Sequence, residues 1–154
     1  MEVKRPKFLA EVQRFTKIGI DSSILIYHLE DVKPYSDLTE AAFEALAEGS
    51  PNAVISTLCI TELLVKPFAD RQPERVALFE QFVLSIPNMT LMAPTYPIAR
   101  QAAALRAKYQ IRTPDALLVA TSLNEQAEAF LTNDKNLRKL KAEGLSILLL
   151  EDYI

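Results

Sequence analysis

Short apolar segments alternate with longer amphipathic segments along almost the whole chain, and this alternation restricts the fold more than any other feature. The apolar segments are four or five residues long and several are rich in β-branched residues, which favour buried strands. Strands that alternate with helices form a parallel sheet, because each helix carries the chain back to the starting edge. We therefore expect an α/β fold of three layers, a parallel sheet flanked by helices on both faces. The expected strands are 17–20, 53–57, 89–92, 129–132 and 146–150.

Residues that start and stop helices divide the amphipathic segments. Ser22 and Ser23 suit a helix start, since a serine oxygen can accept a hydrogen bond from a free N–H of the first turn. Thr113 as the N-cap, with Pro114 at the first helical position, predicts a second start, and Pro67 predicts the end of a short helix. The expected helices are 22–30, 38–48, 58–66, 73–86, 98–109, 113–126 and 133–141.

The chain has 154 residues, the length of one domain. We expect an N-terminal extension over residues 1–16, as an extra helix or a partly ordered arm, and a folded domain over residues 17–154. No apolar run approaches the roughly 18–20 residues of a membrane span, and no apolar leader follows the basic N-terminus. One cysteine, Cys59, fits a reducing compartment. These features predict a cytoplasmic protein that does not enter a membrane.

Four acidic residues lie where a parallel sheet would bring them to one edge. Asp21 ends the first strand and Asp134 follows the fourth, while Asp115 opens the helix 113–126. Glu62 lies within the apolar segment after the second strand, so we expect it to be partly buried and to need a cation, a donor or a cavity. In an open α/β sheet, ligands bind at the carboxyl ends of the strands. Each acid alone has an ordinary structural explanation, and the set of four points to a site.

A cluster of carboxylates without histidine or cysteine suits a hard cation. Mg²⁺ and Mn²⁺ prefer oxygen ligands and keep several waters, and two such ions can promote the cleavage of a phosphodiester. We expect Asp21, Asp115 and Glu62 to hold the first ion and Asp134 to serve a second ion or a water. We expect Ser23 and Thr132 to support the carboxylates by hydrogen bonds and Asn136 to add a contact through water.

Four segments resemble, in order and spacing, the successive motifs of the PIN-domain ribonucleases. They are Asp21–Tyr27, Glu62–Leu63, Thr113–Ala120 and Leu131–Asp134. The resemblance is greatest to the VapC-type toxins of bacterial and archaeal toxin–antitoxin pairs. It implies a PIN-like fold, a Mg²⁺- or Mn²⁺-dependent endoribonuclease activity, and catalytic and metal-binding roles for the four acids. It also implies an RNA substrate, a homodimer and an antitoxin protein that blocks the site.

Basic residues near the expected site are candidates for contacts to the RNA backbone. They are Arg112, Lys135 and Arg138. The net charge of −3 does not itself indicate nucleic-acid binding, although bound cations would offset the clustered carboxylates.

Two other functions stay open at this point. The chain could be a PIN-like interaction module without catalysis, or a stand-alone RNA-processing nuclease without an antitoxin. The extension before the first strand is longer than usual in the toxins, and Asn136 stands where the family often has a further acid. A phosphoaspartate phosphatase is disfavoured because Ser23 occupies the place of its second acid, and with three glycines no phosphate-binding glycine-rich loop is available.

Overall fold

The structure, a computed structural model, describes residues 3–154. Five strands form one sheet in the order β3-β2-β1-β4-β5, and all neighbouring strands are parallel. The α/β fold predicted from the alternating pattern is therefore confirmed. The strands are β1 (Lys17–Ile20), β2 (Asn52–Ser56), β3 (Met89–Met92), β4 (Ala129–Thr132) and β5 (Ser146–Leu149).

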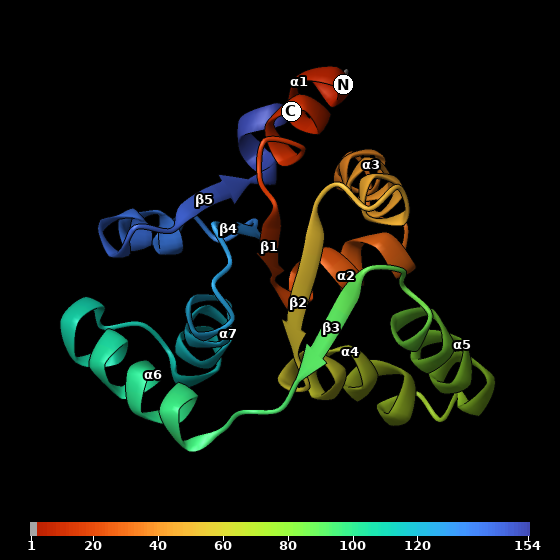
Figure 1. The fold of residues 1–154 in the computed structure, drawn as a ribbon. Coiled ribbons are helices and arrows are strands. Elements are labelled where there is room, and N and C mark those ends of the chain that lie inside the picture. The colour runs from red at the N-terminus through yellow and green to blue at the C-terminus, as the bar shows by residue number, and fades with distance from the viewer. Residues whose placement is uncertain (1–2) are drawn as a thin grey trace.

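Helices cover the sheet on its two faces (Figure 1). The α-helices within residues 3–154 are α1 (Arg5–Val12), α2 (Ser22–Leu29), α3 (Tyr35–Ala47), α4 (Leu58–Ala69), α5 (Pro73–Leu84), α6 (Tyr96–Tyr109) and α7 (Thr113–Asn124). On one face α7 packs against β1, β2 and β4, and α6 packs on α7. On the other face α2 and α4 contact the sheet, α3 packs on α2, and α5 packs on α4. Two 3-10 helices, η1 (Lys135–Glu143) and η2 (Leu150–Tyr153), flank β5.

The centre of the sheet is the most deeply buried part of the fold. Every residue of β4 is buried, as are the last three residues of β1. In β3, at the edge of the sheet, Thr90 and Leu91 are exposed. The carboxyl ends of β1 and β4 therefore open in the middle of the molecule, between the two helical layers.

The ends of several helices differ from the sequence prediction. α4 continues through Pro67 and ends at Ala69, which is possible because a proline so near the last turn removes a single hydrogen bond. The N-cap residues of α2 and α7 are Asp21 and Arg112, and neither helix start has a side-chain capping bond. The predicted serine and threonine caps are therefore wrong. The segment predicted as a last α-helix is the 3-10 helix η1.

The residues before β1 contain a packed helix. Phe8 and Val12 of α1 have no exposed surface, and the ring of Phe8 meets that of Tyr153 edge-on at a centroid distance of 5.1 Å. The Lys4 N–H donates to the Tyr153 carbonyl at 2.7 Å. α1 is thereby joined to the C-terminal end of the chain. Residues 1–2 of the predicted extension lie outside the described residues.

None of the helices in residues 3–154 combines the length and the apolar character needed to cross a membrane.

Candidate functional site

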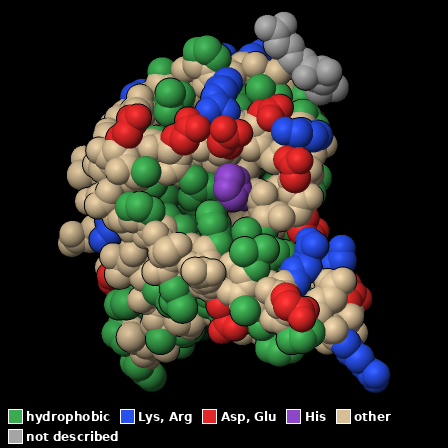
Figure 2. Space-filling model, turned by 90° about the vertical axis from the view of Figure 1, so that its right-hand side faces the viewer, with side chains coloured by type: hydrophobic (Ala, Val, Ile, Leu, Met, Phe, Trp, Pro, Cys, Tyr) green, Lys and Arg blue, Asp and Glu red, His purple; other side chains and the backbone are tan. Residues whose placement is uncertain are grey.

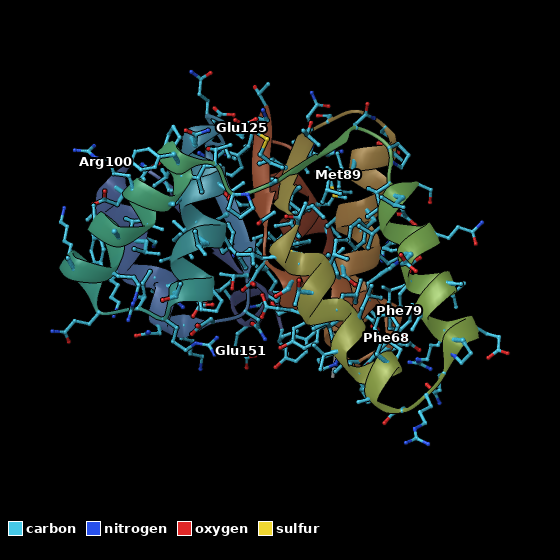
Figure 3. The ribbon with its side chains drawn as sticks, turned by 90° about the horizontal axis from the view of Figure 1, so that it is seen from below. Phe68, Phe79, Met89, Arg100, Glu125 and Glu151 are labelled. Carbon is cyan, nitrogen blue, oxygen red and sulfur yellow. The ribbon has the colours of Figure 1, made fainter. Side chains whose placement is uncertain are left out.

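A cleft of about 260 Å³ opens at the carboxyl edge of the sheet, and all four predicted acids line it. Asp21 follows β1 and Asp134 follows β4, Glu62 comes from α4, and Asp115 comes from the first turn of α7. Figure 3 views the molecule from below, toward the edge at which β2 and β3 end in Figure 1. The other residues that line the cleft are Ser22, Ser23, Ile26, Tyr27, Arg112 and Asn133.

Asp21 is buried, with 7% of its surface exposed. The Thr132 hydroxyl donates to Asp21 Oδ2 at 2.6 Å, and the Ser22 hydroxyl lies 3.3 Å from Oδ1. Burial raises the pKa of Asp21 because the charged form loses hydration. The hydrogen bond from Thr132 opposes this rise in pKa, whereas the negative charges of Asp115 and Glu62 add to it.

Asp115 is also buried, and it forms an ion pair with the exposed guanidinium group of Arg112. Arg112 Nε lies 3.1 Å from Asp115 Oδ2, and Arg112 Nη2 lies 3.4 Å from Oδ1. The side chain of Arg112 is 75% exposed, against 11% for that of Asp115. The pKa of the Arg112 guanidinium is raised by its hydrogen bond and charge interaction with Asp115, and further by the charges of Glu62 and Asp134. Arg112 is thus an exposed counter-ion for three of the four acids, Asp115, Glu62 and Asp134.

Glu62 is exposed, so the predicted partial burial is wrong. Of the apolar neighbours that suggested burial, Ile60 is half-buried and Leu63 faces the core, and the turn of α4 directs Glu62 to the cleft instead. The Ser22 hydroxyl lies 3.1 Å from Glu62 Oε1. Since it also lies near Asp21, this one hydroxyl joins two of the four acids.

Asp134 is the N-cap residue of η1 and accepts a hydrogen bond at Oδ1 from the Asn136 N–H at 2.9 Å. The Asp134 N–H donates to Thr132 Oγ1 at 3.1 Å. Thr132 therefore accepts from the backbone of one acid and donates to the side chain of another, Asp21. This chain of bonds holds the ends of β1 and β4 in a common register.

The three residues expected to support the carboxylates differ in the hydrogen bonds that they make. Ser23 Oγ is buried without a hydrogen-bond partner in the described structure, and Ser22 makes the serine contacts to the acids. The side-chain oxygen of Asn136 accepts from Lys139 at 3.1 Å, and only its backbone N–H reaches an acid. Of the three, Thr132 alone bonds a carboxylate of the cleft through its side chain.

The three basic residues predicted to contact RNA lie in different places. Arg112 lines the cleft. Arg138 instead binds Asp152 through two nitrogens, at 3.0 and 3.2 Å, and Lys135 is exposed at the start of η1.

Three polar residues of the cleft lining had no role in the sequence prediction of the site: Ser22, Tyr27 and Asn133. Tyr27 stacks on Tyr35 at a centroid distance of 4.9 Å. Asn133 Oδ1 accepts from the Glu151 N–H at 2.9 Å, which anchors the loop after β4 to η2; Glu151 is labelled in Figure 3. The adjacency of Ser22 and Asn133 to the predicted acids was the only sequence signal for them.

His28 lies outside the cleft lining. Its ring lies 4.7 Å from that of Phe43 and 5.1 Å from that of Phe82, and its Nδ1 is 3.1 Å from Thr39 Oγ1. Burial lowers the pKa of His28. Figure 2 shows this single histidine among hydrophobic side chains, and its contacts indicate a packing role.

The chemistry of the cleft fits a hydrated hard cation. Its four acidic side chains offer carboxylate oxygens, and the unpartnered Ser23 hydroxyl is a further oxygen at the same cleft. As the side chains stand, however, no three Asp, Glu, His or Cys residues among those described are positioned to hold one ion. Two features keep the carboxylates apart: Asp115 is paired with Arg112, and the side chain of Glu62 is exposed to solvent. Small side-chain movements would be needed for a shared ion.

The sequence profile of the PIN domain matches residues 18–143. Among the curated proteins, none matches the chain significantly. A VapBC2 complex from Rickettsia felis, solved bound to a DNA fragment from its promoter, has a chain with a TM-score of 0.66 and 17% identity, covering 85% of this chain and 96% of that one. A toxin–antitoxin complex from Klebsiella pneumoniae has a chain with a TM-score of 0.60 and 23% identity, covering 84% and 94%. At these identities the two structures establish a shared fold.

Proposed function

Because the chain belongs to the PIN domain family, we propose that it is a metal-dependent endoribonuclease and the toxin of a toxin–antitoxin pair. The observation that carries this proposal is that Asp21, Glu62, Asp115 and Asp134 all line one cleft at the carboxyl edge of the sheet. This edge is where α/β proteins bind their ligands.

Asp21, Asp115 and Glu62 would hold a first Mg²⁺ or Mn²⁺, and Asp134 would serve a second ion or orient a water. Bound divalent ions would supply charge neutralisation and water activation for in-line cleavage of an RNA phosphodiester. Carboxylates with no imidazole or thiolate among the lining residues favour these hard cations over zinc.

The remaining polar residues of the cleft would position the acids and the RNA. Thr132 and Ser22 hold the Asp21 carboxylate by hydrogen bonds, and Ser23 and Asn136 would act through water. Arg112, Lys135 and Arg138 would contact phosphates of the RNA backbone. Of these cations, Arg112 is supported best, because it lines the cleft.

Two observations support a protein partner. The structural neighbours from Rickettsia felis and Klebsiella pneumoniae are toxin–antitoxin complexes. In addition, large apolar side chains of α4 and α5 are more than half exposed, which is common at protein interfaces. They are Val65, Phe68, Leu78 and Leu84. An antitoxin and a second copy of the chain, forming a homodimer, are the partners that we propose.

The decisive experiment is the cleavage of a mixed pool of structured RNAs by the purified protein with Mg²⁺, Mn²⁺ or EDTA, beside the Asp115→Asn variant. We expect metal-dependent cleavage that falls at least about 100-fold in the variant, since the substitution keeps the size of the side chain and removes a metal-binding charge. Equal cleavage by the two proteins would overturn the assignment of Asp115.

A PIN-like interaction module without catalysis predicts a different result. Such a module would cleave no RNA, and Mn²⁺ would not raise its melting temperature, because only a ligand that binds the folded state stabilises it. Mn²⁺-dependent stabilisation without cleavage would instead indicate a metal site that requires a specific RNA.

A further inference from the structure

Arg112 and Asp115 form an ion pair whose two members differ sharply in exposure. The carboxylate is held in the wall of the cleft, whereas the guanidinium side chain is 75% exposed. Arg112 directly precedes α7, in an extended backbone conformation. The arginine can therefore leave the carboxylate by rotating its own side chain into solvent, without any change in the core.

The guanidinium engages both oxygens of Asp115. Nε lies 3.1 Å from Oδ2 and Nη2 lies 3.4 Å from Oδ1. Side-on binding of this kind uses the donor pairs of arginine to match the two acceptors of a carboxylate. A cation that binds Asp115 from the cleft must therefore displace at least one of these contacts.

Arg112 is also the only lysine or arginine among the described residues that line the cleft. Its charge interacts with Glu62 and Asp134 as well as with Asp115. A divalent ion in the cleft would thus meet an existing positive charge close to three of the four acids. The two cations repel each other and compete for the same carboxylate.

We propose that Arg112 is a built-in competitor for the metal ion: it occupies Asp115 in the metal-free protein and must swing away when a divalent cation binds. This inference rests on the proposed metal site. It makes Arg112 a positioning residue that limits metal affinity, and it leaves the guanidinium free beside the cleft once metal is bound, where an RNA phosphate can take the place of Asp115.

The test is a titration with Mn²⁺ alone, followed by calorimetry and by the melting temperature, on the full chain and its Arg112→Gln and Arg112→Lys variants. We expect Arg112→Gln to bind Mn²⁺ about two- to fivefold more tightly, the range that the loss of one exposed ion pair allows. Arg112→Lys keeps the charge and should stay closer to the unchanged protein. Without metal, Arg112→Gln should melt slightly lower, since the acids lose their counter-ion.

Arg14→Gln is the matched control. Arg14 is also an exposed arginine paired with an acid three residues away, Glu11, but it does not line the cleft. Its loss should leave the affinity for Mn²⁺ unchanged, which separates competition at Asp115 from a general effect of net charge.

Unchanged or weaker Mn²⁺ binding by Arg112→Gln, with normal binding by the unchanged protein, would overturn this inference and leave the proposed metal site standing. If the unchanged protein and Asp115→Asn both fail to bind Mn²⁺, the metal site and the competition at Asp115 are both refuted.

Discussion

Asp21 is the acid whose surroundings oppose its ionisation most clearly. Burial raises its pKa above the ordinary 3.8, and neighbouring acids add to the rise. The folded protein therefore holds this proton more tightly than the unfolded chain does. The resulting contribution to stability is complete below the unfolded pKa and is lost as the pH rises through the folded pKa. At neutral pH, the buried Asp21 carboxyl therefore makes the metal-free fold less stable than it is at acidic pH.

We predict that Asp21→Asn raises the melting temperature of the metal-free protein at pH 7 by a few degrees. The amide removes the buried charge and can still accept the hydrogen bond from Thr132. Thermal melts from pH 3 to pH 8 would measure the effect, which should disappear at the acidic end, where Asp21 is protonated. The variant should also lose any stabilisation by Mn²⁺.

Asp152→Asn provides the control for this pH series. Its side chain is 46% exposed, so its charge carries little cost of burial and its removal should not stabilise the fold. A lower melting temperature for Asp21→Asn at pH 7 would contradict the interpretation.

At the scale of elements, the packing of α7 on β1 sets how close Asp21 and Asp115 can lie. Gly19 makes this packing possible: a Cβ at position 19 would lie 1.8 Å from Ser122 Oγ and 2.7 Å from Ser122 Cβ. Because α7 begins beside the cleft and passes β1 at Gly19, a change in their spacing would also move Asp115 relative to Asp21.

We predict that Gly19→Ala lowers the free energy of unfolding by about 2–3 kcal/mol, because the added methyl group overpacks the contact between β1 and α7. Combining it with Ser122→Gly should recover at least about 1 kcal/mol beyond additivity, since the second change removes the colliding side chain. Urea denaturation of the single and double variants would measure both values.

Gly144→Ala is the control for Gly19→Ala, because it adds a methyl group where the cost is backbone strain and not a steric collision. Gly144 has φ +80° and no atom within 4 Å of an added Cβ, so its cost is conformational. Ser122→Gly should not rescue this variant. Additive energies for Gly19→Ala and Ser122→Gly would show that the contact does not limit the packing.

At the scale of the whole molecule, α1 packs against the C-terminal end of the chain. α1 contacts both α3 and η2, and Arg5 Nη1 donates to the Asp37 carbonyl at 2.8 Å. Figure 1 shows α1 next to the C-terminus, at the end of the molecule opposite the strand arrowheads of β2 and β3. The residues before β1 therefore contribute to the core without taking part in the cleft.

We predict that Phe8→Ala lowers the free energy of unfolding by about 3–5 kcal/mol, the usual cost of truncating a fully buried aromatic side chain. Urea denaturation would measure the loss, and Lys7→Ala, a change at an exposed neighbour, should cost less than about 0.5 kcal/mol. Mn²⁺ binding by the folded fraction should be unchanged. A loss below 1 kcal/mol for Phe8→Ala would show that α1 is dispensable for the fold.

The alternation of apolar and amphipathic segments was sufficient to predict the parallel sheet, because this pattern has few packed solutions. It also led to the four acids, since residues that follow parallel strands collect at one edge. The positions of Asp21 and Asp134 at the ends of β1 and β4 could therefore be predicted before their surroundings were known.

The partners of these acids depend on the tertiary structure alone. Ser22 and Ser23 are equivalent helix starters in sequence, and only the position of α4 against α2 makes Ser22 the one that meets Glu62, 40 residues away. Likewise, Thr132 reaches Asp21 across 111 residues because β1 and β4 are neighbours in the sheet. Local sequence determines where a helix or strand begins, but the direction of a side chain toward a distant partner is decided by how those elements pack.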